Sequence, residues 1–430
     1  MKSKKQPSLF FVTHFWAHFD EYVAMALLWK YGESAGIHGS RNSQVLFDDA
    51  GSHVPECITS KHWRDTPLIP VGIWGSWAPF DEHPDSNQPR KHKESAASLV
   101  LKYLKEHVRK FDDPKAEALV AYATPIDNGG GAGKYSLTNL VKNMNWLGRE
   151  DETLLWVTHG IMTYLDCGDP KDTSFELESI GALMPDGVAK TTWILKGHEA
   201  ALWEGAKFQE AVETLKQDRK KIHFSDRKGK RRDLIAMESD NPMMGKAIVS
   251  WAKADVALVR KSTGHVVVLT NVKTRTDLTG LIRALNREEL LLRGDTKERR
   301  FGELSQNGNI QGSVWSFQPD LMCILNGSPS APFVQATMIP FKRIVELAQL
   351  TLDERRFCTE EEGFACNGQS CPSSRKTPCP YFAYGLPRCQ HIRQIAKHGD
   401  TSGEIQPVNA PVRHARDPRF AVLEELRVGS

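Results

Sequence analysis

Short apolar segments that favour β-strands alternate with segments of helical periodicity over the first 130 residues, and this alternation constrains the fold more than any other feature. We predict strands at 8–13, 44–47 and 68–73, and helices at 20–31, 94–108 and 116–122. Strands that alternate with helices form a mostly parallel sheet flanked by helices. The sequence therefore predicts an α/β fold in which ligands bind at the carboxyl ends of the strands.

The chain as a whole is expected to divide into several domains. A length of 430 residues is sufficient for two or three of them. We predict a first domain at 1–150, a helical connecting region at 151–240, a smaller α/β domain at 241–350, a cysteine-rich segment at 351–400 and a loose polar tail at 401–430.

Charge and hydropathy limit the partners of the chain. The formal net charge is only +3, so any basic surface must be local. No apolar run reaches the ~18 residues that a membrane-spanning helix needs, and the N-terminal segment lacks the pattern of a signal peptide. We therefore expect a cytoplasmic protein that does not enter a membrane.

The first predicted strand is followed by the stretch THFWAHFDE, in which His14, His18, Asp20 and Glu21 lie where the strand gives way to a helix. Imidazole and carboxylate groups at these spacings can converge on divalent cations. The alternative is an ordinary helix start, because carboxylates in a first turn interact favourably with the helix dipole. This stretch alone leaves both interpretations open.

Two later segments carry further acidic and imidazole groups. The segment PFDEHPD follows the third predicted strand and contains Asp81, Glu82 and His83, and the segment ATPIDNGGG contains Asp127. Each segment taken alone is typical of a solvated polar turn. Their order along the chain carries more information than any one of them.

The pieces THFWAHFDE, FDEHP, ESAASLVLKYL and IDNGG occur in the order found in the DHH phosphoesterase superfamily. The chain most closely resembles the melanocyte-proliferating-gene branch of DHH-like exonucleases, over about residues 8 to 130. The resemblance implies a DHH-like catalytic domain, followed by a smaller domain that closes over the substrate.

The same resemblance implies a pair of divalent cations. Mixed imidazole and carboxylate ligands suit Mn²⁺, with Mg²⁺, iron or Zn²⁺ as alternatives. Glu82 takes the place of a metal-binding histidine of the family, and His83 takes that of a histidine that contacts the substrate phosphate. The metal ligands implied by the resemblance are His14, His18, Asp20, Glu82 and Asp127.

The sequence departs from the family pattern at the end of the third predicted strand. The family has a metal-bridging aspartate there, and the alignment places Gly72 at that position. Asp48 and Asp49, at the end of the preceding strand, are candidates to supply the bridge. Otherwise the site is one ligand short, and the chain is a catalytically degenerate descendant that binds nucleic acid or nucleotides without cleaving them.

Polar and basic groups elsewhere are candidate substrate contacts. The basic run 216–232 can bind nucleic-acid phosphates, or it can be a solvated linker. In the second α/β domain the candidates are Lys273, Arg275, Asn326 and Ser328.

Five of the eight cysteines lie between 358 and 389. A cytosolic chain does not use such a cluster as a secreted disulfide framework. We therefore expect Cys366, Cys371, Cys379 and Cys389 to bind zinc or an iron–sulfur cluster. The alternative is a set of buried or idle thiols.

These features together predict a divalent-metal-dependent phosphodiesterase, with the character of an exonuclease, that acts on oligonucleotides or nucleotide phosphoesters. The degenerate, non-cleaving binder is the main alternative. A phosphatase or pyrophosphatase that acts on small molecules is a third.

Overall fold

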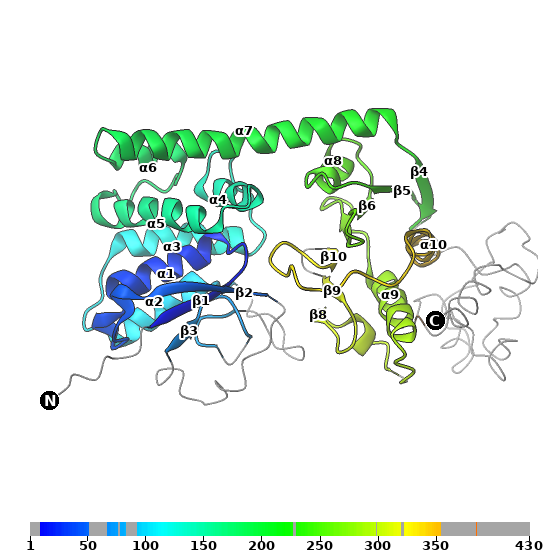
Figure 1. Cartoon of the computed structure of the whole chain (residues 1–430), viewed down its shortest axis with the longest axis horizontal. Helices are drawn as coiled ribbons and strands as arrows, with labels where there is room; N and C mark the ends of the chain where they lie inside the picture. The colour runs from blue at the N-terminus through cyan, green and yellow to red at the C-terminus, as the bar shows by residue number, and fades with distance from the viewer. Residues whose placement is uncertain are drawn as a thin grey trace, which may run out of the picture. The chain divides into compact units, whose positions relative to one another are not determined.

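The computed structural model (Figure 1) describes residues 9–50, 67–75, 78–82, 93–226, 229–297, 299–319, 322–353 and 384. The chain forms two compact units, Met1–Ala206 with Ser328–Phe333 and Lys207–Gly327 with Val334–Ser430. Each unit is built around its own hydrophobic core.

The sheet of the first unit has three parallel strands, and β1 (Phe10–His14) lies in the middle. It pairs with β2 (Gln44–Asp48) on one side and with β3 (Leu68–Pro70) on the other. The apolar side chains of β1 are largely buried, as expected for the central strand of a covered sheet. The predicted α/β class and the parallel sheet are confirmed.

Helices pack in layers beside this sheet (Figure 1). Helix α1 packs against α2, α3 and α5, and every side chain from Phe19 to Leu28 is buried. It is therefore a central helix, covered on all sides rather than along one face. The bounds of the helices are α1 Phe19–Tyr31, α2 Ala96–His107, α3 Pro114–Asp127, α4 Leu137–Trp146, α5 Glu150–Cys167, α6 Leu177–Leu183 and α7 Val188–Gln217.

The second unit contains a seven-stranded mixed sheet in the order β4-β5-β6-β7-β10-β9-β8. Strands β5 and β6 are parallel, and the other neighbours in the sheet are antiparallel. The strands are β4 Lys221–Ser225, β5 Arg231–Glu238, β6 Val256–Arg260, β7 Val266–Thr270, β8 Gly308–Asn309, β9 Trp315–Gln318 and β10 Cys323–Asn326. Its helices are α8 Met244–Ser250, α9 Thr279–Leu292 and α10 Phe341–Leu352, and short 3₁₀ turns occur in the chain at Glu33–Ala35, Ser40–Asn42 and Glu303–Ser305.

The expected helical connecting region at 151–240 differs from the structure at its end. Helices fill it as far as Gln217, but β4 and β5 follow as an antiparallel pair in the sheet of the second unit. Their apolar residues are inconspicuous in the sequence because the basic run 216–232 overlaps both strands. Phe224 and Leu234 nevertheless point into the core of the second unit.

Beyond residue 353 the structure describes Tyr384 alone, so the cysteine-rich segment and the tail fall almost entirely outside the described residues. Among the helices that the structure does describe, none combines the length and apolar character required to cross a membrane.

Candidate metal centre

The turn that carries the histidines lies at the carboxyl end of the first sheet. His14 is the last residue of β1 and pairs in register with Asp48 of β2. Helix α1 begins at Phe19, so residues 15–18 form a tight connection between strand and helix. This is the edge at which parallel α/β sheets bind their ligands.

The connection is fixed by hydrogen bonds from neighbouring elements. The Phe15 amide donates to the Asp48 carbonyl over 2.8 Å. The side-chain amide of Asn145 donates to the Ala17 carbonyl over 3.0 Å. These bonds hold the backbone between the two histidines in one position.

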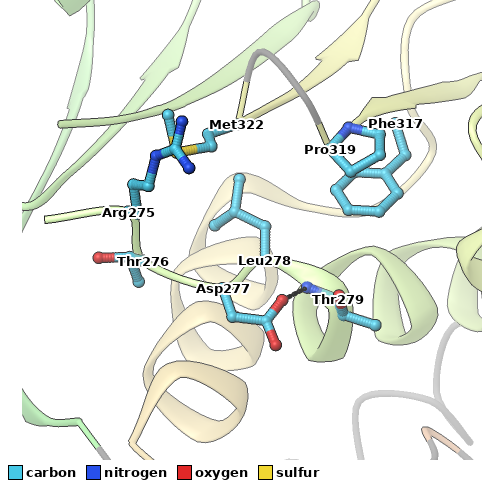
Figure 2. Close-up of a pocket in the computed structure, with 8 residues that line it drawn as sticks. All are labelled: Arg275, Thr276, Asp277, Leu278, Thr279, Phe317, Pro319 and Met322. Atoms are coloured by element: carbon cyan, nitrogen blue, oxygen red, sulfur yellow. Dashed lines mark hydrogen bonds between the residues drawn. The ribbon is translucent and has the colours of Figure 1, made fainter. Parts of the chain in front are cut away.

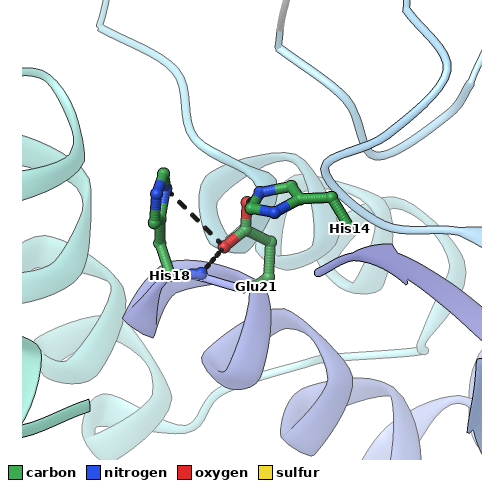
Figure 3. Close-up of side chains that lie close together, drawn as sticks. All are labelled: His14, His18 and Glu21. Atoms are coloured by element: carbon green, nitrogen blue, oxygen red, sulfur yellow. Dashed lines mark hydrogen bonds and ion pairs between the residues drawn. The ribbon is translucent and has the colours of Figure 1, made fainter. Parts of the chain in front are cut away.

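One potential ligand group consists of His14, His18 and Glu21, whose donor atoms lie within 4.8 Å of one another (Figure 3). His14 Nε2 lies 3.0 Å from Glu21 Oε1, and the His18 backbone amide donates to Glu21 Oε2. Both His14 and Glu21 are buried, whereas His18 is exposed. Glu21 therefore belongs to this potential ligand group in addition to its favourable place in the first turn of α1.

The orientation of His14 suits a metal ligand. Its Nδ1 lies 2.8 Å from the Phe15 carbonyl oxygen, which can only accept, so Nδ1 carries a proton. In the neutral ring the lone pair of the other nitrogen, Nε2, then faces the carboxylate of Glu21. A lone pair and a carboxylate oxygen that face each other are reconciled by an added proton or by a cation between them.

A second potential group consists of His18, Asp20 and Asp127, again with donor atoms within 4.8 Å. Asp127 is the last residue of α3, and its Oδ1 lies 3.9 Å from His18 Nδ1. Asp20 accepts through Oδ2 from the Ala96 amide at the start of α2 over 3.2 Å. His18 belongs to both groups and links them.

The buried carboxylates make this site electrostatically unfavourable unless positive charge is added. Burial raises the pKa of Asp20 well above its usual value. Three nearby carboxylates raise it further, those of Glu21, Asp127 and Glu82. Asp20 Oδ1 is also buried with no hydrogen-bond partner within the described part of the chain. Both features fit a divalent cation, which relieves the repulsion and takes the orphaned oxygen as a ligand.

Gly72 explains how Glu21 reaches this position. A Cβ atom built at Gly72 would lie 2.6 Å from both Cγ and Oε1 of Glu21. The Glu21 side chain thus occupies the space that a side chain at position 72 would need. Glu21 was not among the expected ligands, because a contact between distant segments leaves no local pattern in the sequence.

The structure brings together four of the expected ligands, namely His14, His18, Asp20 and Asp127. Glu82 is buried and close enough to Asp20 to affect its pKa, but it joins neither group. Asp49 also joins neither group, and its Oδ2 accepts from the Phe333 amide over 3.2 Å. Asp48 Oδ2 accepts from the Trp74 indole. His83 and the cysteines Cys366, Cys371, Cys379 and Cys389 lie outside the described residues.

The expected substrate contacts differ in character. Lys273 and Arg275 are exposed, and Arg275 lines a cavity of about 260 Å³ at the start of α9 (Figure 2). Asn326 is fully buried, and its amide is bonded to the backbone of Val314, Gln335 and Thr337, which is a structural role. The Ser328 hydroxyl bonds to that of Ser330.

Several cations of the basic run 216–232 are already paired within the protein. Lys216 pairs with Glu213, Lys221 with Asp233, and Arg232 with Asp226 and Asp255. A surface in which acids neutralise the bases is a weaker phosphate-binding site than the sequence indicates.

Fold and site together define an α/β protein with a candidate divalent-cation centre at the carboxyl end of a parallel sheet. No protein-family model matches the chain, and no curated protein matches it. Among solved structures, the chain is similar to an uncharacterized protein from Helicobacter pylori G27 at 10% sequence identity and a TM-score of 0.26. That similarity covers 81% of this chain and 99% of the other, and it is too weak to carry an argument.

Proposed function

We propose that the first unit is a divalent-metal-dependent phosphoester hydrolase that acts on oligonucleotides or nucleotide phosphoesters. The observation that carries the proposal is the pair of ligand groups that share His18 at the sheet edge. They gather residues from two of the four motifs that resemble the DHH phosphoesterases, THFWAHFDE and IDNGG. These residues would hold two cations, which would supply a Lewis acid and a hydroxide nucleophile at neutral pH.

The residues of the chain have distinct roles in this proposal. His14 and Glu21 would hold one cation, and Asp20 and Asp127 would hold the other, while the single lone pair of the neutral His18 ring would complete one of the two sets. The Phe15 carbonyl fixes the ring of His14, and the Ala96 amide fixes Asp20. Glu21 provides the carboxylate that the resemblance expects from position 72. This replacement favours the active hydrolase over the degenerate binder.

Metal content and cleavage test the proposal together. We expect about two Mn²⁺ per chain at this centre and Mn²⁺-dependent cleavage of short labelled oligonucleotides. Asp127→Asn and Glu21→Gln should each reduce the rate by at least about a hundredfold, since loss of a charged ligand weakens metal binding. Asp166→Asn, which changes an exposed carboxylate paired with Lys30, is the matched control and should retain full activity.

The same measurements separate the alternatives. Nucleotide binding without bound metal and without cleavage would support the degenerate binder, whose motivation is Gly72 in place of the bridging aspartate. Cleavage of small phosphomonoesters or pyrophosphate in preference to oligonucleotides would support a phosphatase or pyrophosphatase that acts on small molecules.

We also propose that the cysteine-rich segment binds zinc or an iron–sulfur cluster through Cys366, Cys371, Cys379 and Cys389. Four thiolates suit either group. Elemental analysis should find zinc or iron in addition to the metal of the first unit. Cys371→Ser and Cys379→Ser should remove it, whereas Cys167→Ser, at an exposed free thiol, should not.

A further inference from the structure

Three partly exposed tryptophans form a row that begins in the turn of the candidate metal centre. Trp16 lies between His14 and His18, and its ring meets that of Trp146 edge to face, with centroids 4.4 Å apart. Trp146 in turn stacks against Trp203, with centroids 6.1 Å apart and an interplanar angle of 23°. We call these three side chains the tryptophan row.

Trp16 is held in an unfavourable backbone conformation. Its φ of +60° lies in the left-handed region, which a bulky residue rarely adopts. The next residue is held in place, because the side-chain amide of Asn145 donates to the Ala17 carbonyl. Strain that neighbouring groups maintain is characteristic of functional positions.

The row differs from three tryptophans that lie in or against the core of the first unit. The indoles of Trp29, Trp156 and Trp193 donate to the backbone carbonyls of Ser43, Trp193 and Leu177, respectively. Within the part of the chain that the structure describes, the indoles of Trp16 and Trp203 make no hydrogen bond. Buried indoles normally find such a partner. These two therefore keep their polar edge for solvent or for a ligand.

The geometry of the row also leaves ring surface available. In an edge-to-face contact one ring uses only its edge, so both faces of that ring remain for other partners. All three tryptophans are partly exposed. Each of the three residues therefore retains surface that a planar group can contact.

We propose that the tryptophan row stacks the nucleobases of a single-stranded oligonucleotide, an inference that rests on the proposed function. A phosphoester bound at the histidines lies beside Trp16, which is two residues from each of them. Stacking on aromatic rings accepts any base, so the substrate is recognised without reading its sequence. Bases within a duplex already have both faces covered, so the strand must be single.

Binding of two matched probes tests the row. One is a labelled strand of five thymidines, and the other is a labelled strand of five abasic units with the same number of phosphates. Fluorescence anisotropy is measured on the full chain with Ca²⁺ in place of Mn²⁺, so that cleavage does not consume the probes. We expect the thymidine strand to bind at least about tenfold more tightly.

Substitutions in the tryptophan row test whether this difference in affinity arises from stacking on its rings. Trp203→Leu, in the regular helix α7, and Trp16→Leu should each weaken thymidine binding about tenfold and leave abasic binding unchanged. Trp203→Phe should retain most of the affinity, because it keeps an aromatic face. Leu195→Ala, which removes an exposed apolar side chain from the same helix, should have no effect.

Equal affinity of the unchanged protein for the two probes would overturn the inference. So would a loss of abasic binding as large as the loss of thymidine binding in both leucine variants. Mn²⁺-dependent cleavage of the abasic strand would then still support the hydrolase. Conversely, tighter binding of the thymidine strand without cleavage in the presence of any metal would support stacking on the tryptophan row and contradict the proposed hydrolase activity.

Discussion

At the scale of single residues, the contact between Glu21 and Gly72 decides which carboxylates reach the candidate centre. Gly72 has a φ of +66°, and an added Cβ would strike the Glu21 side chain. The glycine is therefore required twice, once for its backbone conformation and once for the space beside it.

The first prediction follows from this contact. Gly72→Ala should lower the free energy of unfolding by about 2–4 kcal/mol, through backbone strain and the displacement of Glu21. It should also weaken Mn²⁺ binding, measured by calorimetry. Gly36→Ala is the matched control, since Gly36 has a φ of +83° but nothing within 4 Å of the added atom. It should cost only about 1 kcal/mol and leave Mn²⁺ affinity unchanged. Equal Mn²⁺ affinity in both variants would refute the role of Glu21.

The candidate site could be predicted from sequence to the extent that its ligands follow recognisable motifs. His14, His18 and Asp20 share one stretch, and Asp127 lies in a second segment that the resemblance orders after the first. Glu21 and Trp16 lie in the same stretch, but their roles depend on Gly72 and on Trp146. Such contacts arise only when distant segments pack together, so periodicity and spacing do not reveal them.

At the scale of elements, the sequence predicts the helices and strands that have a clear periodicity of apolar residues. It misses the strands whose apolar residues lie among many charged ones. Strands β1 and β2 and helix α2 lie close to their predicted positions. Strands β4 and β5 were missed because both overlap the basic run 216–232, in which lysines and arginines outnumber apolar residues. The charges pair across the strands, as Lys221 does with Asp233.

Helices α9 and α10 are joined by a buried ion pair that gives the second prediction. The Arg343 guanidinium donates to Glu288 over 2.6 Å, and the Tyr384 hydroxyl donates to the same carboxylate. Burial alone would lower the pKa of Arg343, but its bonds to Glu288 and the charge of that carboxylate raise it above the usual value. Arg343→Met leaves the Glu288 charge buried and should destabilise the second unit by about 3–5 kcal/mol in urea unfolding.

Two further substitutions test whether burial of the Arg343–Glu288 pair is the source of its contribution to stability. Tyr384→Phe removes one hydrogen bond to a charged group and should cost about 1.5–3 kcal/mol. Arg149→Met removes an exposed pair with Glu199 and should cost at most about 1 kcal/mol. A similar cost for Arg343→Met and Arg149→Met would show that burial of the pair is not the source of its contribution.

At the scale of the whole molecule, two separate cores predict that a ligand of the first unit protects that unit alone. The apolar residues of the first core all come from residues 9–201, and those of the second from residues 222–352 and Tyr384. The candidate metal groups use only elements of the first unit. A ligand that binds only the folded state stabilises it by about 2.7 kcal/mol at a hundred times its dissociation constant.

Hydrogen exchange measures this effect for each unit separately. Adding Mn²⁺ to metal-free protein should slow amide exchange in β1, α1 and the end of α3 by about a hundredfold at that concentration. Exchange in β6, β7 and α9 should not change, because Mn²⁺ has no expected ligand there. The Asp127→Asn protein should lose the slowing at the end of α3 at the same concentration, since its group of His18, Asp20 and residue 127 lacks one carboxylate. Equal protection of both sheets, or unchanged protection at the end of α3 in the Asp127→Asn protein, would place the cation elsewhere and remove the structural basis of the proposed hydrolase.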